Sequence, residues 1–138
     1  MAPPNSRIPG YFLGLIGVYC VASLIHFTHN AEFVTDYPNL PAWITRSSVY
    51  GAWLAITAVG VTGLVLLKLG LRVPGLILIA GYSALGFAGL DHYWVAPVSA
   101  HSLAMNATIW FEVAAAAVLM VTTFVLLLRP ARVEPQPG

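Results

Sequence analysis

The chain has 138 residues, of which 59% are hydrophobic and only 8% are charged. Its mean hydropathy is +0.82, whereas a water-soluble domain is usually about a quarter charged. The formal net charge of +1 and the single cysteine exclude a basic nucleic-acid surface, an intrachain disulfide and any multi-cysteine metal site. Four apolar runs of roughly 20 residues instead predict an all-α protein, a four-helix transmembrane bundle with short loops whose main partner is the lipid bilayer.

The first predicted helix covers about 9–30. It is long enough to span a bilayer, and no small-x-small cleavage site precedes His26, so we interpret it as an uncleaved span rather than a signal peptide. The turn sequence "DYPNLP" (36–41) follows. Because the residue before a proline is pushed out of the α region, this stretch predicts a loop.

The second predicted helix covers about 47–69. Thr45 or Ser47 is the expected N-cap, since a hydroxyl there accepts a hydrogen bond from the first turn. Gly60 and Gly63 lie within the apolar run. Their missing side chains predict that a neighbouring helix approaches closely at this point.

The third and fourth predicted helices cover about 74–94 and 102–128. The third carries small residues at helical spacing, which predicts a face for tight helix packing; these are Ala80, Gly81, Ala84, Gly86, Ala88 and Gly89. The tail 130–138 is rich in proline and charge, which predicts a disordered segment. The rest of the chain, 1–129, is predicted to form a single domain.

The basic residues predict the orientation. All but one fall on the same side of a four-span topology: Arg7, Lys68, Arg72, Arg129 and Arg132. The positive-inside rule then puts both termini in the cytoplasm, and we expect a bacterial inner membrane. Arg46 alone falls on the outer side, where it is expected to pair with Asp36 or Glu32. An aromatic belt is predicted at the outer interface, comprising Tyr37, Trp43, Tyr93 and Trp94.

All four histidines fall at the outer end of the predicted bundle: His26, His29, His92 and His101. Residues three or four apart share a helix face, so His26 and His29 point the same way. By the same argument His101, Met105, Thr108 and Glu112 form one stripe on the fourth helix. The polar residues of two helices therefore lie where they can meet.

Imidazole and carboxylate together are the ligands that Zn, Cu and Fe prefer. Our first hypothesis is a transition-metal (Zn, Cu or Fe) or haem site for metal handling or redox chemistry. Its candidate ligands are His26, His29, His101, Asp91, His92 and Glu112. The alternative is that each histidine is an interfacial residue. His26 fits that alternative least, because it lies about one turn inside the interface and needs a polar partner there.

Glu112 also predicts function on its own. It lies in the outer half of the fourth helix, where a carboxylate is costly unless it is protonated, paired or hydrated. Our second hypothesis is a small-molecule or lipid-binding pocket anchored by Glu112 and lined by Asn106, Trp110 and Tyr82; the sequence leaves open whether the protein is an enzyme. A third is a non-catalytic accessory subunit of a larger membrane complex or a homo-oligomer, docked through the small-residue face of the third helix.

Overall fold

The structure is a computed structural model that describes residues 8–129, and it confirms the all-α prediction. Four helical stretches are long and apolar enough to cross a membrane, and residues 8–129 form no strand. In chain order the elements are α1 (Gly10–Glu32), α2 (Arg46–Lys68), α3 (Arg72–Leu85), the 3-10 helix η1 (Gly86–Asp91), α4 (His92–Val95), the 3-10 helix η2 (Val98–Ala100) and α5 (Leu103–Leu128). The predicted tail 130–138 lies outside the described residues, as do Arg7 and Arg132. The orientation in the membrane stays a prediction.

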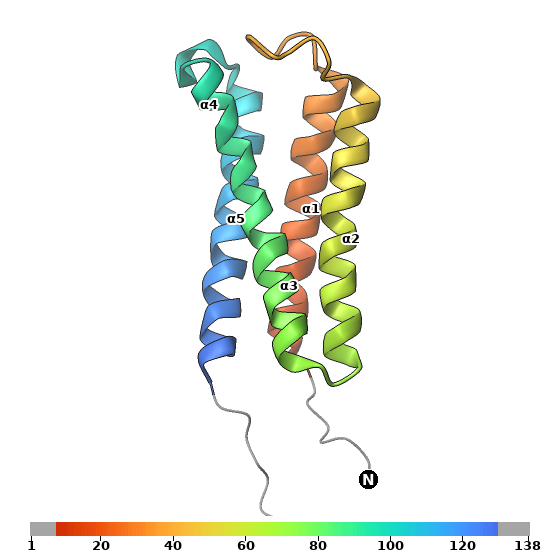
Figure 1. The fold of residues 1–138 in the computed structure, drawn as a ribbon. Coiled ribbons are helices and arrows are strands. Elements are labelled where there is room, and N and C mark those ends of the chain that lie inside the picture. The colour runs from red at the N-terminus through yellow and green to blue at the C-terminus, as the bar shows by residue number, and fades with distance from the viewer. Residues whose placement is uncertain (1–7, 130–138) are drawn as a thin grey trace, which may run out of the picture.

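The bundle has two different ends. α1 begins and α5 ends beside the α2–α3 turn, at the bottom of Figure 1. The α1–α2 loop, α4 and η2 lie together at the top. We call this the histidine end, because it is the end nearest to His26, His29, His92 and His101.

Local sequence signals explain where the helices begin. Thr45 caps α2: its hydroxyl accepts a hydrogen bond from the Ser48 amide at 3.2 Å, and the Ser48 hydroxyl in turn bonds the Thr45 backbone. Ser102 caps α5 in the same manner, with the Met105 amide at 3.2 Å. Both hydroxyls satisfy amides that the first helical turn leaves unpaired. Of the two acids predicted to pair with Arg46, the structure shows Glu32, whose Oε1 lies 2.6 Å from a guanidinium nitrogen of Arg46.

The third span differs from the continuous helix that the sequence predicts. After Leu85 it tightens into η1 before α4 completes the crossing. The tightening brings the backbone close to its neighbours: a Cβ at Gly86 would lie 2.7 Å from Tyr19 and from Ala116. The predicted small-residue face is therefore only partly right, since Ala84 and Ala88 are exposed and the glycine makes the tight contact.

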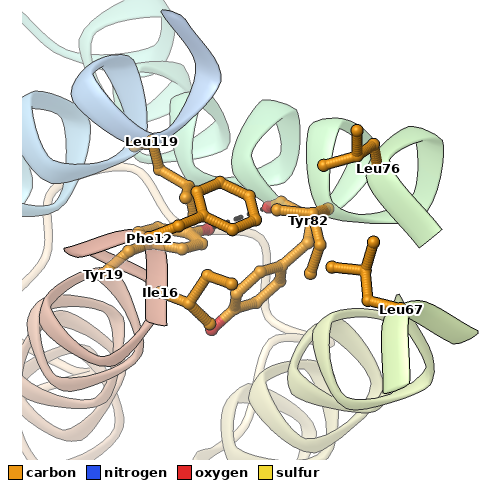
Figure 2. Close-up of a cluster of buried hydrophobic side chains, with 9 residues drawn as sticks. Phe12, Ile16, Tyr19, Leu67, Leu76, Tyr82 and Leu119 are labelled. Carbon is orange, nitrogen blue, oxygen red and sulfur yellow. Dashed lines mark hydrogen bonds between the residues drawn. The ribbon is translucent and has the colours of Figure 1, made fainter. Parts of the chain in front are cut away.

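The apolar core lies toward the opposite end and draws side chains from all four spans (Figure 2). The rings of Tyr19 and Tyr82 pack against each other within this core, with their centroids 4.6 Å apart. The Tyr19 hydroxyl donates to the backbone carbonyl of Tyr82 at 3.1 Å. A buried hydroxyl without a partner would be costly, so this bond lets a tyrosine serve as a core residue. The others labelled in Figure 2 are Phe12, Ile16, Leu67, Leu76 and Leu119.

α2 and α3 pack closely through glycines, as predicted for Gly60 and Gly63. A Cβ at Gly60 would lie 2.7 Å from the Tyr82 ring, and one at Gly63 would lie 2.9 Å from Ile79. The outside of the bundle is also apolar: Leu54 and Val121 expose 62% and 64% of their surface. Water is a poor solvent for such a surface and lipid is a good one, which together with the four helices apolar enough to span a bilayer supports a membrane protein.

Candidate functional site

A cluster of buried polar side chains lies at the histidine end. His26 comes from α1, His92 begins α4, His101 lies between η2 and α5, and Glu112 comes from α5. These four residues expose 2%, 9%, 6% and 1% of their surface, while His29 is half-buried. We call His26, His92, His101 and Glu112 the His–Glu cluster. Buried ionisable groups at membrane depth are costly unless they have partners or a function, so this cluster is the first candidate site.

The three rings of the cluster form a continuous series. The centroid of His92 lies 5.6 Å from that of His26 and 6.1 Å from that of His101. The sequence could not establish that these side chains meet, because helix rotation is not fixed by spacing. In the structure α1, α4 and the start of α5 bring them together, with His92 in the middle.

Tyr37 packs beside the histidine rings and does not belong to the predicted aromatic belt. It exposes only 3% of its surface, so its assignment to the aromatic belt is wrong. Its ring lies 4.8 Å from that of His92, and its hydroxyl oxygen lies 2.9 Å from Nδ1 of His29. Burial raises the pKa of Tyr37 to about 12. The neutral phenol can therefore donate to His29, which is how His29 is held at the edge of the cluster.

His26 and Glu112 face each other across α1 and α5. The Thr108 hydroxyl donates to the Met105 carbonyl at 3.0 Å, and so accepts from Nδ1 of His26 at 3.4 Å. Nε2 of His26 is then a lone-pair nitrogen, and it lies 3.7 Å from Oε2 of Glu112. Neither carboxyl oxygen of Glu112 has a hydrogen-bond partner within residues 8–129. Gly89 covers the pair, since a Cβ there would lie 3.5 Å from Oε2.

His101 is oriented as a metal-binding histidine commonly is. Its Nδ1 donates to the Pro97 carbonyl at 3.0 Å, and its Nε2 is buried with no partner in the described part of the chain. Such an outer bond fixes the ring and leaves the other nitrogen available. Yet among residues 8–129 no three His, Cys, Asp or Glu side chains are grouped so as to hold a metal ion. The predicted metal site stays a prediction.

Two residues of the predicted ligand pocket lie beside Tyr93. Asn106 accepts a hydrogen bond from the Tyr93 hydroxyl at 2.7 Å and donates to the His101 carbonyl at 3.2 Å. Trp110 is exposed and stacks on Tyr93 with centroids 6.1 Å apart. Tyr82 belongs to the apolar core described above. A ligand pocket of Asn106, Trp110 and Tyr82 around Glu112 therefore stays a prediction.

A cavity of about 420 Å³ lies elsewhere at the histidine end, between α1, α2 and the η1–α4 segment. Its apolar wall includes Phe27 of α1, Val49 and Ala52 of α2, and Ala88 of η1. Glu112 does not line it. This pocket is thus separate from the one that the sequence predicts around Glu112, although both lie at the same end.

The loop between α1 and α2 roofs the cavity with residues 40, 41, 43 and 44. Asn39, just before them, has a φ of +58°, which asparagine tolerates better than most residues. Its side-chain amide donates to the Val95 carbonyl at 2.9 Å, and Val95 itself lines the cavity. This hydrogen bond connects the α1–α2 loop, which covers the cavity, to Val95 at the end of α4.

Asn30 and His92 lie in the wall of the cavity, whose other polar residues are Ser48 and Asp91. The Asn30 amide nitrogen donates to Nε2 of His92 at 3.2 Å. The Asn30 amide oxygen is buried and has no hydrogen-bond partner among residues 8–129. His92 contacts the cavity on one side and His26 on the other. It therefore joins the cavity to the His–Glu cluster.

Sequence reasoning missed two residues of this site. Asn30 gave no signal, because one asparagine at the end of a predicted helix looks like a boundary residue. Tyr37 looked like an interface residue, because nothing in a turn sequence shows that the loop folds back over the bundle. No protein-family model, curated protein or solved structure matches this chain.

Proposed function

We propose that the protein binds a small, mainly apolar molecule in the cavity at the histidine end, with the polar group of that ligand against Asn30 and His92. The observation that carries the proposal is the cavity of about 420 Å³ with a buried, unpartnered amide oxygen in its wall. Ligand pockets commonly measure about 300–1,000 Å³ and combine apolar walls with a few polar groups. The anchor differs from the Glu112 that the sequence indicates.

The chemistry of the wall supports a ligand that donates a hydrogen bond. A buried acceptor without a partner costs about 1–3 kcal/mol. A ligand hydroxyl or ammonium beside Asn30 would remove that cost, and the apolar remainder of the ligand would fill the space between Phe27 and Val49. Binding would then stabilise the folded protein in proportion to ligand concentration.

The experiment compares two alanines of α2. Both are exposed, but Ala52 lines the cavity and Ala58 does not. We expect 1-decanol to raise the unfolding temperature of wild-type protein in lipid nanodiscs. Ala52→Phe should raise the decanol concentration needed for the same stabilisation at least tenfold, because the new ring fills the cavity. Ala58→Phe should leave the effect of decanol intact. Equal stabilisation of both variants would mean that decanol acts through the bilayer, and would overturn the proposal.

A second candidate function is transition-metal binding by the His–Glu cluster. The orientation of His101, with its Nε2 buried and unpartnered, favours it. The rings of His26 and His101 would have to turn toward a shared ion. Elemental analysis and an absorbance spectrum of protein purified without a His-tag or chelator test this. About one metal or haem per chain, lost in His26→Ala and His101→Ala, would support it; none after adding back Zn, Cu and Fe would eliminate it.

A further inference from the structure

The charges around the cavity are one-sided. Asp91 lines it, whereas no lysine or arginine does. Glu32, at the end of α1, is already engaged by Arg46 at 2.6 Å and by the Tyr50 hydroxyl at 2.7 Å. Asp91 has no ion-pair partner within residues 8–129. Within residues 8–129 the cavity lining therefore carries one carboxylate, on the exposed Asp91, and no lysine or arginine.

The polar groups of the cavity residues also include an acceptor without a donor. The Asn30 amide oxygen is unpartnered, and Nε2 of His92 is taken by the Asn30 amide nitrogen. The Ser48 hydroxyl lines the cavity but already donates to the Thr45 carbonyl at 2.8 Å. A carboxylate or phosphate would meet the Asp91 carboxylate and the Asn30 oxygen, both of which repel it.

Two aromatic side chains, Phe27 and Trp43, line the same cavity. The face of an aromatic ring attracts a cation, and indole does so most strongly. A carboxylate, an amide oxygen and aromatic rings around a mainly apolar space are together suited to one class of ligand.

We propose that this ligand is an amphipathic amine: its ammonium group lies between Asp91 and Asn30, and its apolar chain occupies the cavity under the Leu40–Ile44 roof. The inference rests on the proposed ligand-binding function and adds the charge of the ligand. The ammonium donates to both oxygens, so each partner acquires the group it lacks. Asp91 supplies the preference for a cation and the apolar walls supply the affinity for the chain.

The test uses three probes with the same ten-carbon chain: decylamine, 1-decanol and decanoate. Each is titrated into wild-type protein, Asp91→Asn and Ala52→Phe in zwitterionic nanodiscs at pH 7, with the unfolding temperature as the readout. In wild-type protein we expect decylamine to bind most tightly and decanoate least. Asp91→Asn should weaken decylamine binding about tenfold, because the negative charge beside the ammonium is lost while an acceptor oxygen remains, and should change decanol binding less than about twofold.

The control variants separate the two possible failures. Charged probes enter the bilayer equally in wild-type protein and in Asp91→Asn, so a difference between these proteins reports the residue itself. If decylamine and decanol bind alike, or Asp91→Asn leaves decylamine unchanged, the amine proposal is overturned while the ligand-binding function stands. If Ala52→Phe responds to every probe as wild type does, the cavity is not the binding site and both proposals fall.

Discussion

His26 and Glu112 depend on each other for their place in the protein interior. His26 Nε2 lies 3.7 Å from Glu112 Oε2, and both residues are almost fully buried. Replacing only His26 with leucine removes the imidazole nitrogen that faces the Glu112 carboxyl group. We expect His26→Leu to lower the free energy of unfolding by about 3 kcal/mol, because one member of a buried pair is left alone.

The double variant is the informative comparison. In His26→Leu with Glu112→Leu, neither polar group remains, and a buried pair replaced by apolar residues is often close to neutral. We therefore expect the double variant to recover most of the lost stability in denaturant unfolding. Additive losses in the two single variants and the double variant would show that the residues do not interact.

Asn30 is expected to matter for binding more than for folding. Asn30→Leu removes one hydrogen bond to His92 but also removes an unpartnered buried oxygen. These effects oppose each other, so the unfolding free energy of ligand-free protein should change by less than about 1 kcal/mol. The stabilisation by decanol should be lost. A variant that unfolds far more easily without ligand, yet still responds to decanol, would contradict this role.

The site residues that sequence analysis found share one property. His26, His92, His101 and Glu112 are ionisable groups in or beside apolar runs, and such residues are conspicuous because lipid makes them costly. Asn30 is neutral and Tyr37 is amphipathic, so neither looks out of place at a helix end. Their roles depend on the rotation of α1 and the path of a loop, which one sequence does not specify.

At the scale of elements, the interruption of the third span positions the site. η1 carries Gly86 against Tyr19 and Gly89 against Glu112, and α4 then presents His92 to both the cavity and the cluster. Short 3-10 stretches within helices often mark functional or strained segments. Here the stretch sets the rotation of His92 relative to the helix below it.

Gly86 and Gly81 offer a matched test of that packing. A Cβ at Gly86 would lie 2.7 Å from Tyr19 and Ala116, whereas one at Gly81 would meet nothing within 4 Å. We expect Gly86→Ala to lower the unfolding free energy by about 2 kcal/mol, as overpacking does. Gly81→Ala should be neutral or slightly stabilising, because alanine favours helix. Equal effects of the two substitutions on denaturant unfolding would contradict the packing at η1.

The elements themselves were largely predictable. Apolar runs and turn residues gave α1, α2 and α5 to within two residues, and Thr45 was a predicted cap. The change from α to 3-10 geometry after Leu85 was not predictable. Glycine and alanine at helical spacing indicate close packing, but they do not say which of them touches a neighbour, and the exposed Ala84 shows the difference.

In the whole molecule, the two halves of the bundle contain different kinds of side chain. The apolar core around Tyr19 and Tyr82 fills one half, and the cavity and His–Glu cluster occupy the other. Four spans would place the start of α1 and the end of α5 on the same side of a membrane. The distribution of basic residues predicts that the histidine end faces outward.

Cysteine labelling tests this orientation. In a Cys20→Ala background, Thr35→Cys lies in the α1–α2 loop and Lys68→Cys ends α2, and both positions are exposed. A membrane-impermeant maleimide added to intact cells or spheroplasts should label the cysteine at 35 and spare the one at 68 until the membrane is broken. Labelling at 68 alone would reverse the predicted orientation and put the cavity on the cytoplasmic side.

The central claim is that one amphipathic molecule occupies the cavity of each chain, and native mass spectrometry tests it most directly. Wild-type protein, Ala52→Phe and Ala58→Phe would each be released from detergent in the presence of decylamine. We predict one decylamine per chain in wild type and in Ala58→Phe, and none in Ala52→Phe, whose new ring fills the space under the loop. The same decylamine occupancy in all three proteins would contradict the account.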